Sequence, residues 1–251
     1  MIETTQQDGV AILSLAHGKA NALDLELCDA IIAAFKDIET SAVRAIVLTG
    51  QGRMFSAGVD LVRLLDGGTA YVRQFLPTLH RLYDTVFHHP KPVIAAINGH
   101  AIAGGCVLHC CADRRIMARD SGRTGVTELL VGLPFPALAF EVIRFAVVPR
   151  YFPDIVTSGA TVPPDVALER GLVDEIVEPG ALIERAVAAA RTLAALSPEA
   201  FAQTKRQIRL PLTERMERNG AAVDAAVTDI WTRPDALKSI EAYVSATFKK
   251  S

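Results

Sequence analysis

Short apolar runs rich in β-branched residues recur along the chain, and helical patterns separate them. The runs span 10–15 (VAILSL), 45–50 (AIVLTG), 92–99 (PVIAAING), 114–118 (RRIMA) and 172–177 (LVDEIV). Runs of this length and composition predict buried strands. Apolar faces predict helices over 23–39, 69–89 and 137–148, and we expect Pro77 to kink or split the second helix. Strands that alternate with helices predict an α/β layered fold.

The pattern changes near residues 190–197. From Ser197 onward strand signals vanish, and 197–210, 214–231 and 233–250 all favour helices. We therefore expect two parts in the chain, a layered core over 1–195 and a helical region over 196–251.

Composition excludes several classes of function. Half of the 251 residues are hydrophobic and the formal net charge is −2, so the chain supports a sizeable core but has no basic footprint for nucleic acid. The first ten residues show no secretory-signal pattern, and no apolar run approaches the length of a membrane span. No G-x-G-x-x-G follows the first strand, and no P-loop is present. We expect a cytoplasmic protein without membrane or nucleic-acid partners.

Three of the four cysteines lie close together, at Cys106, Cys110 and Cys111. A metal site made of Cys106, His109 and Cys110 is one interpretation of this cluster. The favoured interpretation is a set of small buried thiols in a packed helix, since no second cluster supplies further ligands. The prediction from the sequence is therefore that no metal binds.

The segment GRMFSAGVDLVRLL, residues 52–65, carries a turn of small residues before a helical pattern. Such a turn lets a ligand approach the backbone closely, and Asp60 is placed to cap the helix that follows. The alternative is an ordinary loop that leads into a helix.

A second glycine turn lies in NGHAIAGGCVLHCC, residues 98–111, where Gly104 and Gly105 open a predicted helix. The first amides of a helix have no partners within it, and the helix dipole adds positive potential there. Two such amides, one from each turn, would form an oxyanion hole. The alternative is that the two glycines only permit tight helix–sheet packing.

The third segment, GVTELLVGLPFP at 125–136, places Glu128 among apolar residues. An apolar environment raises the pKa of a carboxyl group and makes it a better base near neutral pH. The alternative is a solvated surface glutamate, which is the commoner situation for this residue type.

Taken together, these segments resemble the crotonase family, also called the enoyl-CoA hydratase/isomerase family. The similarity runs in order through HGKANALDLEL, GRMFSAGVDL, INGHAIAGGCVLHCCADRRI, TELLVGLPFP, SGATVPPDVALERGLVDEIV and SPEAFAQTKRQIR, and so covers nearly the whole chain. The resemblance implies a right-handed spiral of ββα turns with a C-terminal helical region that covers the site. It also implies a homotrimer or a dimer of trimers.

The resemblance implies specific roles for individual residues. The amides of Val59 and Gly104 would stabilise the enolate of an acyl-CoA thioester, and Glu128 would be the catalytic acid–base. The residues expected to bind coenzyme A are Lys19, Ala20, Ala22, Ala57, Gly58, Asp60, Leu61, Gly105 and Thr127. Its phosphates would meet Lys19, Arg53 or Arg63, and Phe135 and Phe140 would bound the acyl chain. No separate cofactor is expected, because coenzyme A is part of the substrate.

This sequence departs from the hydratases of the family at Val107. Hydratases carry a glutamate on the helix after the Gly-Gly turn and a second in the later segment; here only the second, Glu128, is present. A single carboxylate suffices to move a proton from C2 to C4, so the pattern favours a Δ3,Δ2-enoyl-CoA isomerase. Atypical hydration, thioester hydrolysis and a catalytically silent acyl-CoA-binding protein are the alternatives. The sequence indicates neither the acyl chain nor the pathway.

Overall fold

The computed structural model describes residues 1–248, and its centre is a six-stranded sheet. The strand order is β1 (Ile2–Gln7), β2 (Val10–Leu15), β3 (Ala45–Gly50), β5 (Val93–Ile97), β7 (Arg114–Ala118) and β9 (Glu175–Val177). β1 and β2 are antiparallel and the other pairs are parallel. All five predicted strands are present, the last shortened to three residues. β1 was not predicted, because its exposed side chains are mostly polar.

A second, three-stranded parallel sheet consists of β4 (Met54–Ser56), β6 (His100–Ile102) and β8 (Thr124–Gly125). Each strand of this small sheet precedes a helix: α2 (Leu61–Phe87), α3 (Gly104–Cys110) and α4 (Glu128–Val131) respectively. The chain therefore repeats strand, strand and helix three times, as the predicted spiral requires. Because β4, β6 and β8 are parallel neighbours, the three segments that follow them leave the small sheet at the same edge.

The helices begin where local chemistry favours it. α1 (Leu25–Thr40) is capped by Asp24, and α2 is capped by Asp60, whose carboxylate accepts from the amides of Val62 and Arg63. The capping role predicted for Asp60 is thus confirmed. α2 begins eight residues earlier than predicted, and its backbone breaks at Gly68 (φ 55°, ψ −151°) rather than at Pro77, which lies inside the helix. The predicted split at Pro77 is therefore wrong. The break lies at Gly68 instead, because glycine tolerates a positive φ.

Buried apolar side chains lie on both faces of the large sheet. α1 and α2 pack together on one side and bury residues such as Phe35, Phe75 and Leu82. α8 (Leu182–Ala194) covers the other side through Ala186 and Ala190. The remaining short helices are α5 (Ala137–Ala146), α6 (Phe152–Ser158) and α7 (Pro164–Arg170), with 3₁₀ turns at Pro149–Tyr151 and Pro179–Ala181.

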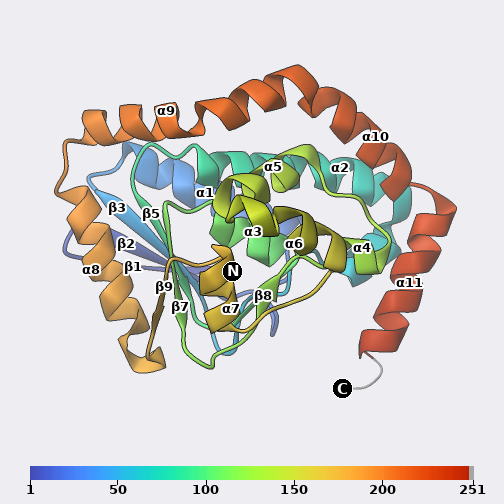
Figure 1. The fold of residues 1–251 in the computed structure, drawn as a ribbon, viewed down its shortest axis with the longest axis horizontal. Helices are drawn as coiled ribbons and strands as arrows, with labels where there is room; N and C mark the ends of the chain where they lie inside the picture. Colours follow the sequence, from blue (N-terminus) through green and yellow to red (C-terminus); the bar gives the residue numbers. More distant parts are fainter. Residues whose placement is uncertain (249–251) are drawn as a thin grey trace.

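The C-terminal region contains helices α9 (Pro198–Arg215), α10 (Ala221–Trp231) and α11 (Pro234–Phe248), with a π-helical turn at Met216–Gly220. They run around the outside of the molecule from one side to the other (Figure 1). Within residues 1–248 no strand follows Val177, as predicted. Two residues of the last predicted helix, at 249–250, lie outside the described part. α9 is anchored where buried Lys205 and Arg209 bind Asp113 at 2.6 and 2.7 Å.

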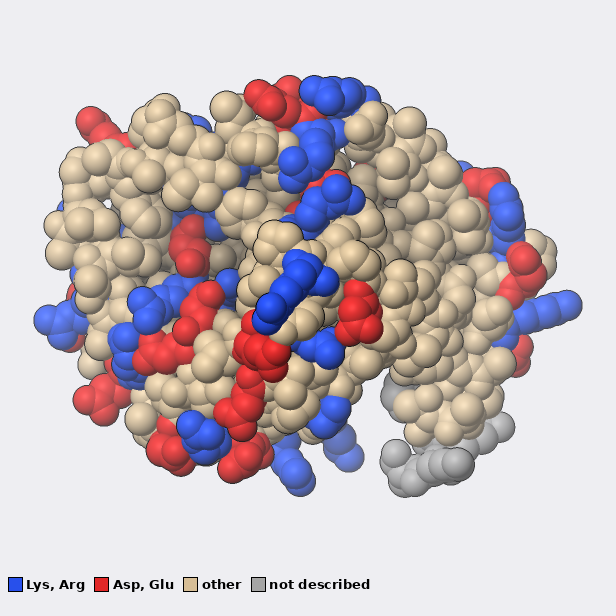
Figure 2. All heavy atoms as spheres, in the orientation of Figure 1, with Lys and Arg blue, Asp and Glu red and all other residues tan. Residues whose placement is uncertain are grey.

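The surface carries charges of both signs. Lysine and arginine side chains are intermixed with aspartate and glutamate on the face shown in Figure 2, and broad uncharged areas lie between them. Within the described residues, every helix is too short or too polar to cross a membrane.

Candidate active site

Two segments expected to bind coenzyme A lie side by side. The Ala57 amide donates to the Ala20 carbonyl at 2.9 Å, the Leu23 amide donates to the Gly58 carbonyl at 2.7 Å, and the Asp60 amide donates to the Leu23 carbonyl at 3.0 Å. The turn after β4 is therefore bound along its length to residues 20–23. This pairing leaves the Val59 amide on the opposite side of the turn.

The two glycine turns meet backbone to backbone. A methyl group added at Gly58, where φ is +84°, would lie 2.9 Å from the Gly104 nitrogen and 2.6 Å from the Ile102 carbonyl oxygen. Only glycine fits there, on grounds of both backbone geometry and space. Ala103, just before α3, has a positive φ of 49°, which is strained for a residue with a side chain.

The amides of Val59 and Gly104 are free to bind a ligand. Neither donates a hydrogen bond to any residue among those described, and both residues line one cavity of about 430 Å³. Gly104 also opens α3, where amides have no partner within the helix. Two unpaired amides from adjacent turns, in the wall of one cavity, have the composition of an oxyanion hole.

Most of the residues singled out in the sequence line this cavity. They are Ala20, Ala22, Ala57, Val59, Asp60, Leu61, Gly104, Thr127 and Glu128. Gly58 lies directly behind the two amides, and Gly105 packs on Ser56, so both act on the shape of the wall rather than forming its surface. Lys19 is exposed outside the cavity, as are Arg53 and Arg63, and Arg63 is paired with Glu26.

Glu128 is the first residue of α4 and carries a carboxyl oxygen without a partner. Its Oε2 is buried and accepts no hydrogen bond from the described residues, although the residue as a whole is partly exposed. Burial in this apolar cavity raises the pKa of Glu128 to about 7, and hydrogen bonds from the amides at 127 and 128 only partly oppose the shift. A carboxyl group in this state exchanges protons readily near neutral pH.

Two other positions differ from Glu128 in their capacity for proton transfer. Val107 is fully buried in α3 and is absent from the cavity wall, so its position contributes an apolar contact to the core. Asp60 does line the cavity, but one of its carboxylate oxygens accepts the two amides at the start of α2. Glu128 differs from both positions because one of its carboxyl oxygens, Oε2, is buried and has no hydrogen-bond partner among the described residues.

Several residues of the wall were not assigned to the site from the sequence. The buried Tyr83 hydroxyl donates to the Gly104 carbonyl at 3.1 Å, and Trp231, Tyr243 and Thr247 also line the cavity. The sequence does not distinguish these roles for Tyr83 and Trp231, because an aromatic residue on an apolar helix face has the same pattern whether it packs helices or lines a cavity. The signal that would have found Tyr83 is its hydroxyl, since a buried tyrosine hydroxyl needs a partner.

A second cavity, of about 500 Å³, lies on the other side of the segment that follows α4. Phe135 and Phe140 line this second cavity and not the one that contains Glu128. Their predicted place beside the acyl chain at Glu128 is therefore not what the structure shows. Helix α10 contributes to both cavities, because Val227 lines the second and Trp231 lines the first.

Comparison with known proteins decides the family. The sequence model described as enoyl-CoA hydratase/isomerase matches residues 5–248. The chain belongs to the enoyl-CoA hydratase/isomerase family. Members of this family act on acyl-CoA thioesters, and the spiral of ββα turns with a helical C-terminal region is their crotonase fold.

The relatives of this enoyl-CoA hydratase/isomerase family member include proteins named as hydratases and proteins named as isomerases. A putative enoyl-CoA hydratase of Thermus thermophilus is 33% identical over 86% of this chain and 85% of its own length. The mitochondrial enoyl-CoA delta isomerase 1 of mouse is 25% identical over 100% of this chain and 88% of its own. The crystal structure of human mitochondrial delta3-delta2-enoyl-CoA isomerase has a TM-score of 0.94 at 22% identity, covering 100% of this chain and 99% of that one, which establishes the fold.

Proposed function

We propose that this protein is a Δ3,Δ2-enoyl-CoA isomerase in which Glu128 moves the proton. The observation that carries the proposal is the unpartnered, buried Oε2 of Glu128 in a cavity that also contains the free amides of Val59 and Gly104. The substrate would be a 3-enoyl-CoA whose thioester oxygen accepts from both amides.

In the proposed reaction Glu128 removes a proton from C2 and the electron pair moves toward the thioester oxygen. The resulting dienolate carries negative charge on that oxygen, where two amide donors stabilise it, each donor contributing about 3 kcal/mol to the transition state. The same carboxyl group then returns the proton at C4, and the double bond now lies between C2 and C3. No water is consumed, so a second acid–base group is not required.

Hydration is the second candidate, and one observation favours it. Hydration needs a group that positions water in addition to the base, and Tyr83 places a hydroxyl in the wall of the cavity with Glu128. The product distinguishes the two reactions. A 3-enoyl-CoA that becomes a conjugated 2-enoyl-CoA supports isomerisation, whereas a 2-enoyl-CoA that becomes a 3-hydroxyacyl-CoA supports hydration.

The test of the assigned base is Glu128→Gln, which keeps the shape of the side chain and removes its basicity. We expect kcat for isomerisation to fall by about 10²–10⁴-fold, because that is the usual contribution of general acid–base catalysis. Exchange of C2 hydrogens into heavy water should fall with it, while binding of acyl-CoA persists. Full turnover by the variant would overturn the role of Glu128, and tight binding by the wild type without any C2 exchange would identify a silent binding protein.

A further inference from the structure

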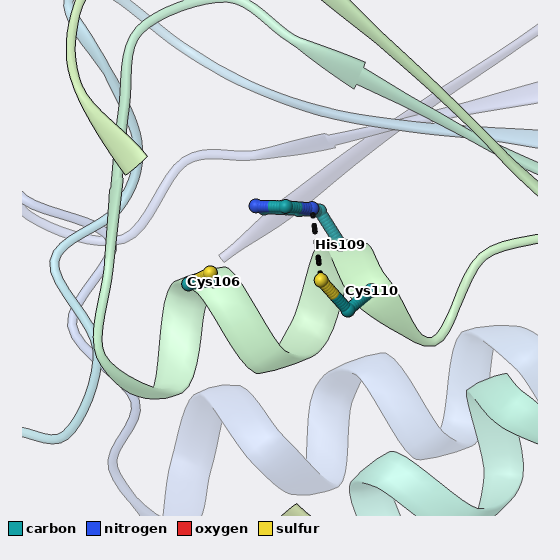
Figure 3. Close-up of side chains that lie close together, drawn as sticks. All are labelled: Cys106, His109 and Cys110. Carbon is teal, nitrogen blue, oxygen red and sulfur yellow. Dashed lines mark hydrogen bonds between the residues drawn. The ribbon is translucent and has the colours of Figure 1, made fainter. Parts of the chain in front are cut away.

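A second cluster of chemically active side chains lies in α3, outside the cavity of the proposed active site. Cys106, His109 and Cys110 rise from the same side of this helix (Figure 3), and one sulfur or nitrogen atom of each lies within 4.8 Å of the other two. All three are buried. Neither cysteine nor the histidine lines the cavity that contains Glu128, so the proposed isomerase reaction makes no use of them.

The histidine is held in the orientation that metal-binding histidines adopt. Its Nε2 is hydrogen-bonded to Thr124 Oγ1 at 2.8 Å, and its Nδ1 lies 3.6 Å from Cys110 Sγ. When Nε2 carries the proton and donates it to Thr124, the lone pair of Nδ1 is free on the side of Cys110 Sγ. Metal-ligating histidines in proteins are usually fixed in this way, by a hydrogen bond from the nitrogen that does not bind the metal.

One positively charged side chain lies close to the cluster. Arg115 of β7 lines the same cavity as Cys110 and is bound to Asp174. Its guanidinium would offset the excess negative charge of a centre made of two thiolates and a monovalent ion.

The cluster has an opening. Cys110 lines a cavity of about 270 Å³ whose other walls come from α5, β7, α8 and α9 and from the residues just after α3. Cys110 is therefore the ligand nearest the outside, with His109 and Cys106 behind it. The same wall contains Asp113, Arg115, Lys205 and Arg209.

We propose that Cys106, His109 and Cys110 form a binding site for one thiophilic d¹⁰ metal ion, with Cu(I) as its best occupant. Thiolate and imidazole ligands select Cu(I) and Zn(II) among the common ions, and Zn(II) sites in proteins are almost always four-coordinate. Among residues 1–248 no fourth histidine, cysteine or carboxylate joins the cluster. Three soft ligands therefore suit Cu(I) better. Binding forms two Cu–S bonds and one Cu–N bond and displaces a proton from each protonated thiol, with no oxidation or reduction.

The experiment is a Cu(I) titration of the full chain under anaerobic conditions, in competition with a chromogenic Cu(I) chelator. We expect one Cu(I) per chain, and a loss of at least about 100-fold in affinity in Cys106→Ser and Cys110→Ser. Cys28→Ser and Cys111→Ser are the matched controls, because both of these cysteines are buried but lie outside the cluster; they should retain the wild-type affinity. Circular dichroism checks that each variant is folded.

A variant beyond the ligands separates metal binding from simple packing. Thr124→Val keeps the shape of the side chain but removes the hydroxyl that orients His109, and we expect it to weaken Cu(I) binding by about tenfold. Fewer than one Cu(I) per ten chains in the wild type would overturn the proposal. So would unchanged affinity in both cluster variants, or binding of Zn(II) alone in a parallel titration.

Discussion

At the scale of single residues, the proposed role of the Glu128 carboxyl group as a base makes activity depend on pH. A base must be deprotonated to act, and burial raises the pKa of Glu128 to about 7. We expect kcat/KM to fall about tenfold per pH unit below 7 and to level off above it, because kcat/KM follows the ionisation of the free enzyme. Initial rates with a 3-enoyl-CoA from pH 5.5 to 8.5 measure this. A rate independent of pH over that range would contradict the assignment.

The same carboxyl group opposes stability as pH rises. Its folded-state pKa, about 7, lies above the ordinary value of 4.5, so the folded state binds the proton more tightly than the unfolded state does. The cost of ionising Glu128 is absent below pH 4.5, grows between pH 4.5 and 7, and then stays constant at about 3 kcal/mol. Glu128→Gln should therefore gain stability relative to the wild type on going from pH 5 to pH 8. Urea unfolding at both values tests this, and an equal difference at the two would contradict it.

At the scale of elements, the proposed oxyanion hole depends on the contact between two turns. Gly58→Ala would place a methyl group 2.9 Å from the Gly104 nitrogen and push the turns apart. We expect a fall in kcat of about 10²–10³-fold, the usual effect of losing one oxyanion donor. Gly52→Ala is the matched control, since Gly52 has a positive φ of 65° but open space around it. That variant should show the backbone strain alone, a loss of stability of about 1–2 kcal/mol with kcat unchanged. Equal kcat values for the two variants would contradict the assignment of the hole.

The elements also show what sequence patterns predict well and what they leave out. β3 and β5 were predicted because both faces of these strands are buried, which produces continuous apolar runs. β4, β6 and β8 are two or three residues long, too short for any periodicity to appear. The segments around residues 59, 104 and 128 were found through their glycines and their order. Tyr83 and Trp231 were missed as wall residues, because the sequence does not show which way a buried aromatic side chain faces.

At the scale of the whole molecule, the C-terminal region is fixed to the spiral by a buried ion cluster. Lys205 and Arg209 of α9 are 5% and 2% exposed, and both bind Asp113. Burial lowers the pKa of Lys205 to about 8 even though Asp113 opposes this shift. Without Asp113, the buried positive charges of Lys205 and Arg209 would have lost their carboxylate partner. We expect Asp113→Ala to cost about 3–5 kcal/mol of unfolding free energy, as expected when a buried charge loses its partner. Asp154→Ala, which removes an exposed partner of Arg170, should cost less than about 1 kcal/mol. Similar urea midpoints for the two variants would contradict this account.

Association of the whole chain is a separate expectation. Leu130 and Ile208 are 57% and 58% exposed, and further large apolar side chains are exposed near them in sequence at Leu129 and Leu210. A trimer or a dimer of trimers, which the family resemblance implies, would remove apolar surface of this kind from water. Light scattering on the purified protein should give three or six times the mass of one chain. A monomer at micromolar concentration would refute the expectation.

The cavity around Glu128 has walls from two parts of the chain that are distant in sequence, and only one of these parts contains the groups proposed to react. The groups that would carry the reaction all lie between residues 20 and 139, whereas Trp231, Tyr243 and Thr247 come from α10 and α11. Substitutions in the last two helices can therefore reshape the space offered to a substrate while the reacting groups stay in place. Substrate preference in such a protein can therefore change through substitutions in α10 and α11, while the chemistry at the carboxyl group stays the same.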